Sequence, residues 1–110
     1  MSKTEAKILV VDDDIDVLNT ARMYLKQQFT LVQIENDPEQ IPDHLEREAF
    51  DVVLLDMNFK KGDNEGEEGL KWLNRILTID PNAIVILITA YGEFDLAVKA
   101  VKAGATDFLP

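Results

Sequence analysis

Residues Asp51–Asn58 have the sequence Asp-Val-Val-Leu-Leu-Asp-Met-Asn, an apolar run between two aspartates. Four apolar residues, 52–55, follow one another without alternation and end at the carboxylate of Asp56. A short Val/Leu run between polar residues predicts a strand buried on both faces, as in parallel sheets. Asp56 would then lie at the carboxyl end of that strand, where open α/β sheets place their ligands.

Two other apolar runs repeat this pattern. Residues 8–11 (Ile-Leu-Val-Val) end at three successive aspartates, 12–14, and residues 84–88 (Ile-Val-Ile-Leu-Ile) end at Thr89. If the three strands are parallel, the polar residues that follow them gather at one edge of one sheet. We take this edge as the candidate functional site.

The chain as a whole predicts alternating strands and helices. Strands are expected at about residues 7–11, 31–35, 52–55, 84–88 and 105–109, with residues 1–6 as a frayed lead-in. Helices are expected between them, and Gly104 stands where a helix cap belongs. The connections are long enough for right-handed crossovers. The prediction is a doubly wound, flavodoxin-like α/β domain with a five-stranded parallel sheet in the order 2-1-3-4-5.

Local signals add detail to the helices. Asp13 or Asp14 is expected to cap the first helix, because a carboxylate accepts the unpaired amide hydrogens there. Helical spacing predicts one buried face for this segment, made of Ile15, Leu18, Ala21, Leu25 and Phe29. Pro42 predicts that the second helix begins irregularly, since a proline deeper in a helix loses a hydrogen bond. Trp72 is expected to be half-exposed, and His44, the only histidine, to be a solvated surface residue without a role.

Composition excludes several classes of function. The 110 residues suffice for one domain, and 21 acidic against 11 basic residues give a formal net charge of −10. Such a chain is repelled by nucleic acid and by anionic membranes. No Cys is present, so thiolate chemistry is excluded. No apolar run approaches the roughly twenty residues that cross a bilayer, so a soluble cytoplasmic domain is expected.

The strand ends predict metal-assisted phosphoryl chemistry. In the order 2-1-3-4-5, Asp12 and Asp13 lie beside Asp56, and carboxylates this close either raise their pKa values or bind a cation. A few carboxylates, a carbonyl and waters are how proteins usually hold Mg²⁺. Asp56 could then accept a phosphoryl group, and the Thr89 hydroxyl could donate to it. Taken singly, each residue has an ordinary role as a cap, loop or strand residue, so the conjunction carries the prediction.

These residues resemble a known family. Ile8–Asp14, Asp51–Asn58, the segment Ile-Thr-Ala-Tyr-Gly at 88–92 and the segment Ala-Gly-Ala-Thr-Asp-Phe-Leu-Pro at 103–110 are similar to the receiver domain of bacterial two-component response regulators. The resemblance covers essentially the whole chain in the expected order. The tail from Thr89 to Pro110 is most similar to the nitrogen-regulator (NtrC-like) branch.

The resemblance implies a role for each site residue. Asp56 would be the phosphoacceptor, served by a sensor histidine kinase or phosphotransfer protein. Asp13, Asp56 and the backbone carbonyl of Asn58 would hold Mg²⁺, with Asp12 supporting through water. Thr89 would be the switch hydroxyl. In the same family the residue matching Phe108 is an aromatic switch that turns inward.

The chain departs from the family's pattern in two places. The family's phosphoryl-pairing lysine and last helix would follow Pro110, so residues 1–110 are expected to be a receiver domain that stops before its last helix. ATPase and DNA-binding output domains would lie beyond residue 110, and a homodimer is a further expectation. The loop Phe59–Gly69 is longer than the family's usual turn.

Three rival hypotheses remain open at this point. The alternative to a phosphorylation switch is a pseudo-receiver, a protein-interaction module that works without phosphorylation. A phosphatase or dehalogenase with an Asp-x-Asp nucleophile pair is a weaker rival, because Asn58 stands where the second aspartate belongs. A flavodoxin is weaker still, since three aspartates after the first strand would repel a flavin phosphate.

Overall fold

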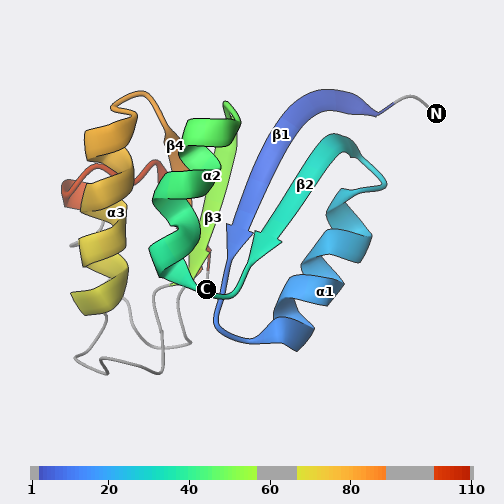
Figure 1. Ribbon diagram of the computed structural model, residues 1–110, viewed down its shortest axis with the longest axis horizontal. Helices are drawn as coiled ribbons and strands as arrows, with labels where there is room; N and C mark the ends of the chain where they lie inside the picture. Colours follow the sequence, from blue (N-terminus) through green and yellow to red (C-terminus); the bar gives the residue numbers. More distant parts are fainter. Residues whose placement is uncertain (1–2, 57–66, 89–100, 110) are drawn as a thin grey trace.

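A computed structural model of the chain describes residues 3–56, 67–88 and 101–109. Its strands form one parallel sheet in the order β2-β1-β3-β4-β5, so the predicted fold and strand order are confirmed (Figure 1). The strands are β1 (Thr4–Val11), β2 (Phe29–Glu35), β3 (Val52–Asp56), β4 (Ile84–Ile88) and β5 (Asp107–Leu109). The helices are α1 (Ile15–Leu25), α2 (Ile41–Arg47) and α3 (Glu67–Ile79), with a 3-10 turn, η1 (Pro38–Gln40), before α2.

The register of the central strands aligns their carboxyl ends. Val11, the last residue of β1, pairs with Leu55 of β3, and Asp56, the last residue of β3, pairs with Ile88 of β4. Because the strands are parallel and in register, the residues that follow them emerge at the same edge. This alignment is what places the polar strand ends together.

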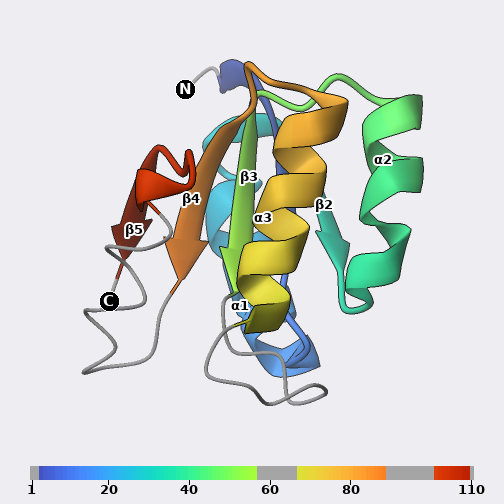
Figure 2. The ribbon, with the colours of Figure 1, turned by 90° about the vertical axis from the view of Figure 1, so that its left-hand side faces the viewer.

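Helices cover both faces of the sheet, which explains why its strands are apolar without alternation (Figures 1 and 2). Alternate residues of a strand point to opposite faces. One face packs against α2 and α3 and the other against α1. The first core contains Leu9, Val11, Ile41, Val53, Leu55, Trp72, Leu73, Ile76, Val85, Leu87 and Ala105; the second contains Ile8, Val10 and Leu18, with Ala21, Leu25, Val52 and Leu54 packed against it.

Helix α1 begins where predicted but ends earlier. Asp14 is its cap, and its side chain accepts the backbone N–H groups of Asp16 and Val17. The prediction that Ile15 is buried is wrong: its side chain is 50% exposed. In Figure 1 the start of α1 lies beyond the carboxyl ends of β1 and β2, whereas Leu18, at the end of the first turn, is fully buried. Phe29 belongs to β2 instead of the helix, although it packs in the same core.

The chain before α2 confirms the predicted irregular start. The segment leaves β2 through η1 and then enters α2 with Pro42 in the first turn. A proline is tolerated there, because the first N–H groups of a helix have no partner within the helix. Ile41 is fully buried and Leu45 packs against the same core, as expected.

Two sequence predictions about order and burial are wrong. Residues 4–6 are not a frayed lead-in, because β1 begins at Thr4, which pairs with Phe29 and donates its N–H to Gln28 O at 2.7 Å. Trp72 is not half-exposed but 7% exposed, within the α2–α3 core. Its indole N–H donates to Glu68 Oε2 at 3.2 Å, so the buried ring keeps a hydrogen-bond partner.

Gly104 has the conformation that its predicted cap position requires. Its φ is +116°, a region that favours glycine, and its N–H donates to Val101 O at 3.1 Å. A Cβ at this position would lie 2.7 Å from Leu77 Cδ1. Most of the predicted fourth helix lies outside the described residues.

Candidate functional site

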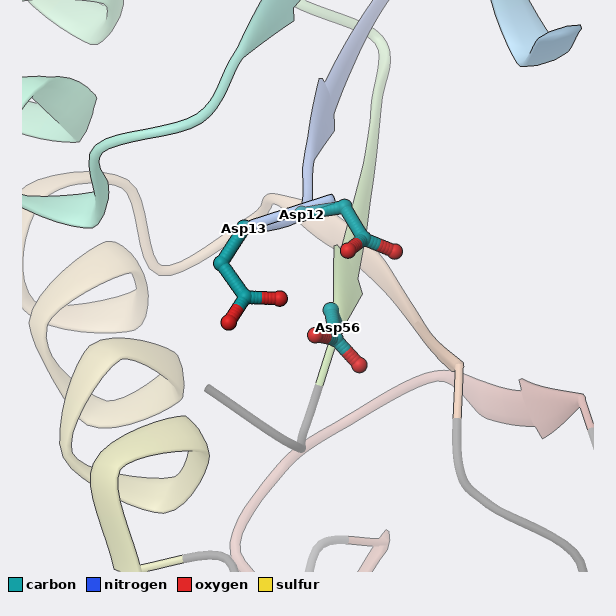
Figure 3. A group of neighbouring side chains, drawn as sticks. All are labelled: Asp12, Asp13 and Asp56. Atoms are coloured by element: carbon teal, nitrogen blue, oxygen red, sulfur yellow. The ribbon is translucent and has the colours of Figure 1, made fainter. Parts of the chain in front are cut away.

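Three aspartates form a cluster at the carboxyl ends of β1 and β3 (Figure 3). Asp12 and Asp13 follow β1 directly, and Asp56 is the last residue of β3. Each offers a carboxylate oxygen, and these oxygens all lie within 4.8 Å of one another. The cluster that the strand order predicted is therefore present.

The cluster is shielded from water, which makes its charges costly. Asp12 and Asp56 are only 6% and 7% exposed, whereas Asp13 is half-buried. Burial raises the pKa of Asp12; the neighbouring charges of Asp13 and Asp14 add to this effect, and a hydrogen bond from the Asp14 N–H opposes it. Desolvated like charges are strongly stabilised by a bound cation, so the cluster favours one.

The three successive aspartates after β1 have different surroundings. Asp14 is exposed and caps α1, which resolves the two alternatives that the sequence left open. Asp13 instead contributes a carboxylate oxygen to the cluster. Asp12 accepts the Asp14 N–H at Oδ1, 2.9 Å away, and donates its own N–H to Glu35 O at 3.1 Å. Asp12 is thus fixed through its side chain by the turn after β1 and through its backbone by the end of β2.

The donor set suits a small, hard cation. Oxygen ligands bound to one Mg²⁺ at about 2.1 Å lie at most roughly 4.2 Å apart. The oxygens of the cluster lie within 4.8 Å, so small side-chain rotations or one bridging water would complete such a site. Mg²⁺ keeps several waters when it binds to proteins, so three carboxylates are enough.

Several predicted site residues lie outside the part of the chain that the structure describes. These are Asn58 and Thr89, together with most of the loop Phe59–Gly69. For Phe108 only the backbone is described: it belongs to β5 and pairs with Leu87. The strand β4 ends at Ile88, directly beside Asp56 in register. Among the predicted residues, the structure thus brings together Asp12, Asp13 and Asp56.

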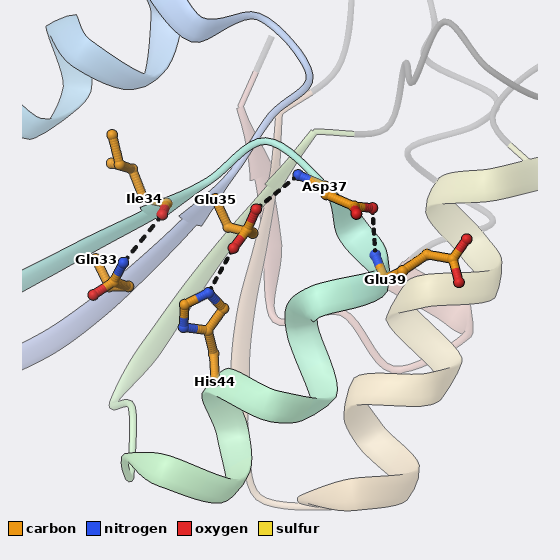
Figure 4. A network of polar contacts seen from close by, with 6 residues as sticks. All are labelled: Gln33, Ile34, Glu35, Asp37, Glu39 and His44. Atoms are coloured by element: carbon orange, nitrogen blue, oxygen red, sulfur yellow. Dashed lines mark hydrogen bonds and ion pairs between the residues drawn. The ribbon is translucent and has the colours of Figure 1, made fainter.

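The sequence analysis missed the contact between His44 and Glu35 (Figure 4). His44 is not a solvated surface residue, because its Nε2 lies 2.8 Å from Glu35 Oε1 and its side chain is 16% exposed. Glu35 is also the residue whose carbonyl accepts the Asp12 N–H. His44 and Glu35 lie on different elements and are nine positions apart, so no local pattern joins them.

Comparisons with known proteins agree with the fold. The family model "Response regulator receiver domain" matches residues 8–110. The chain is 35% identical over 109 residues to the transcriptional regulatory protein ZraR of Klebsiella oxytoca, and 35% identical over 103 residues to the response regulator protein PilR of Pseudomonas aeruginosa. These alignments cover 99% and 94% of the chain but only 24% and 22% of the relatives, so the chain spans about a quarter of their length.

Solved structures give the same result. The N-terminal signal receiver domain of a two-component response regulator from Bacteroides fragilis superposes with a TM-score of 0.85 at 38% identity, covering 96% of this chain and 84% of that one. NtrX from Brucella abortus, solved with ADP, gives a TM-score of 0.84 at 27% identity, covering 96% of this chain and 23% of that one. Within the described ranges, no helix has the length and apolar content to cross a membrane.

Proposed function

The chain belongs to the response regulator receiver family of two-component signalling, and we propose that it is switched by phosphorylation of Asp56. The observation that carries the proposal is the buried cluster of Asp12, Asp13 and Asp56 at the carboxyl edge of the sheet. The similarity to ZraR, PilR and NtrX agrees with the resemblance to the nitrogen-regulator branch.

Asp56 is the nucleophile of the proposed transfer. One of its carboxylate oxygens attacks the phosphorus of a phosphohistidine on a sensor kinase or phosphotransfer protein. The P–N bond breaks, its electron pair stays on the imidazole nitrogen of the donor, and Asp56 carries an acyl phosphate. The position of Asp56 at the end of β3 supports this role, because the strand holds its backbone while the carboxylate lies at the sheet edge.

Asp12, Asp13 and Asp56 hold Mg²⁺ in this proposal, together with the backbone carbonyl of Asn58. When bound, the ion neutralises the negative charge that collects between the carboxylates and the incoming phosphoryl group. Asp12 is held by hydrogen bonds at both its N–H and its Oδ1. We assign it the role of orienting the site, through a water, and Asp13 that of a direct ligand.

The switch itself involves the ends of β4 and β5. Thr89 follows β4 directly, and Phe108 lies on β5, paired with Leu87. In the proposal, Thr89 moves so that its hydroxyl donates to a phosphoryl oxygen, and Phe108 turns inward as Thr89 moves. The register supports this coupling, because β4 lies between β3, which carries Asp56, and β5.

Residues 1–110 are, in this proposal, a cytoplasmic receiver domain that controls ATPase and DNA-binding output domains elsewhere in a longer protein. Its net charge of −10 makes direct DNA binding by this domain unfavourable. Its own chemistry is limited to gaining and losing the phosphoryl group at Asp56. A homodimer is a further element of the proposal.

The test is the intact mass of the chain after incubation with acetyl phosphate, with and without Mg²⁺. A Mg²⁺-dependent gain of one phosphoryl group is expected in the wild type and not in Asp56→Asn. If an unmodified mass persists even in a longer chain that continues past residue 110, the phosphorylation switch is wrong and the pseudo-receiver alternative replaces it.

A further inference from the structure

Glu35, the last residue of β2, is a branching point of the hydrogen-bond network beside the aspartate cluster (Figure 4). Its backbone carbonyl accepts the N–H of Asp12 at 3.1 Å. Its side chain accepts the N–H of Asp37 at Oε2, 3.0 Å away, and Oε1 lies 2.8 Å from His44 Nε2. One residue thus connects the end of β1 with the turn after β2 and with α2.

The pair of Glu35 and His44 is more shielded than an ordinary surface ion pair. Their side chains are 17% and 16% exposed. A carboxylate only accepts hydrogen bonds, so His44 Nε2 carries the proton and donates it, whether the imidazole is neutral or charged. Hydrogen bonds to a charged acceptor are shorter and stronger than those between neutral groups. The side chain of Glu35 is therefore held from two directions.

The chain contains a second pair of this kind, between β1 and the segment after α2. Lys7 Nζ in β1 lies 3.2 Å from Glu48 Oε2, just after α2, with side chains 43% and 37% exposed. Both pairs join a strand to the α2 segment. Of these two pairs, the Glu35–His44 pair is the one with a hydrogen bond to a member of the aspartate cluster, from Asp12 N–H to Glu35 O.

We propose that Glu35 and His44 are positioning residues for the metal site: together they fix the end of β2, and through the Glu35 carbonyl they fix the backbone of Asp12. The inference rests on the proposed function, since it assigns a supporting role for Mg²⁺ binding by the cluster. Neither side chain is among the predicted ligands. They act through the hydrogen bond between Asp12 N and Glu35 O.

The strict geometry of Mg²⁺ makes this support measurable. Mg²⁺ demands a nearly ideal octahedron, so a small displacement of one ligand lowers its affinity. Groups that orient metal ligands typically change affinity by about 10- to 100-fold when they are removed. Because Glu35 acts through a backbone contact instead of touching a ligand side chain, we expect about a 10-fold loss for Glu35→Ala and about 3-fold for His44→Ala, at or below the lower end of that range.

The experiment is calorimetric titration of the folded chain with MgCl₂. The variants are Glu35→Ala, Glu35→Gln and His44→Ala, with Glu48→Ala and Lys7→Ala as the matched controls. Glu35→Gln removes the same charge as Glu35→Ala but keeps one accepting oxygen for His44 or for the Asp37 N–H. Circular dichroism establishes that each variant is folded, and the amide proton shift of Asp12 in NMR spectra reports its hydrogen bond to Glu35.

Positioning predicts weaker binding in Glu35→Ala, partial recovery in Glu35→Gln and wild-type affinity in both controls, with a shifted Asp12 amide in the weakened variants only. Equal losses in Glu35→Ala and Glu35→Gln would mean that the charge alone matters, and would overturn the inference. Wild-type affinity in Glu35→Ala and His44→Ala would overturn it as well, while leaving the proposed function intact. If the wild type itself binds no Mg²⁺, the proposed metal site and this inference both fall.

Discussion

Two aspartates stand at opposite ends of β3, and their surroundings differ completely. Asp51, just before the strand, is exposed; its Oδ2 accepts the Lys7 N–H and its own N–H donates to Lys7 O, both at 2.8 Å. Asp56, at the other end, is 7% exposed and lies with two more carboxylates. An aspartate thus hydrogen-bonds to the backbone of the neighbouring strand at one end of β3, and belongs to a cluster of carboxylates at the other end. Parallel strand order makes the difference, because it aligns all carboxyl ends at one edge.

The largest expected effect separates the chemistry of these two ends. Asp56→Asn should abolish Mg²⁺-dependent phosphorylation by acetyl phosphate, because an amide oxygen is a poor nucleophile for phosphorus. Asp51→Asn should be phosphorylated to the same extent as the wild type, since Asp51 only accepts a backbone hydrogen bond. The fraction of modified chain in intact-mass spectra measures both. Comparable loss in both variants would contradict the distinction.

The next effect concerns the strand between the two aspartates. Leu55 is fully buried, so Leu55→Ala should lower the free energy of unfolding by about 2–5 kcal/mol through lost burial and the cavity left behind. Ile84, at the start of β4, is 43% exposed, and Ile84→Ala should change the free energy of unfolding by only about 0.5 kcal/mol. Urea unfolding with an unchanged m-value measures the difference. Equal losses at both positions would contradict the difference in burial between Leu55 and Ile84.

Mg²⁺ and pH should both act at the carboxyl end, through the aspartate cluster. The pKa of Asp12 is raised in the folded chain above its ordinary value of 3.8, chiefly by burial. At pH values between 3.8 and the higher pKa of Asp12 in the folded chain, the folded state therefore binds more protons than the unfolded state. The free energy of unfolding falls as the pH rises through the folded pKa of Asp12. At pH values above the folded pKa of Asp12, the charged cluster destabilises the folded chain until a cation binds.

Two measurements test this dependence of stability on pH. At pH 7, Mg²⁺ at 100 times its Kd should stabilise the chain by about 2.7 kcal/mol, and this gain should disappear as protons compete for the carboxylates at acidic pH. Without Mg²⁺, Asp12→Asn should be more stable than the wild type at pH 7 and equal to it well below pH 3.8. Thermal unfolding at several pH values tests both, and a destabilised Asp12→Asn at pH 7 would show that burial of the charge is not costly there.

The smallest effects belong to the amino end. Asp51→Ala removes one hydrogen bond to the backbone and should cost about 1 kcal/mol. Lys7→Ala removes an exposed ion pair with Glu48 and should cost less than about 1 kcal/mol. Neither change should alter Mg²⁺ affinity. An affinity loss in Lys7→Ala would mean that Lys7 is coupled to the aspartate cluster after β1.

Sequence patterns predicted the strand order from the alternation of strands and helices, and the aspartate cluster from the apolar runs 8–11 and 52–55, which end at carboxylates. The same patterns failed where the outcome depends on which neighbour covers a residue. Periodicity marked Ile15 as buried, but Ile15 is 50% exposed at the start of α1. Trp72 was expected at a half-exposed position, but its ring enters the core beside α2 and α3. The contact between His44 and Glu35 joins two elements, and only the folded chain brings them together.

The central claim is that the phosphoryl group is carried at the carboxyl end of β3 by Asp56. The most direct measurement is to phosphorylate the chain with acetyl phosphate and Mg²⁺, reduce the acyl phosphate with borohydride, and locate the resulting homoserine by peptide mass spectrometry. The account predicts homoserine at position 56 alone, in the wild type and in Asp51→Asn. Homoserine at Asp12, Asp13 or Asp51, with none at position 56, would contradict it.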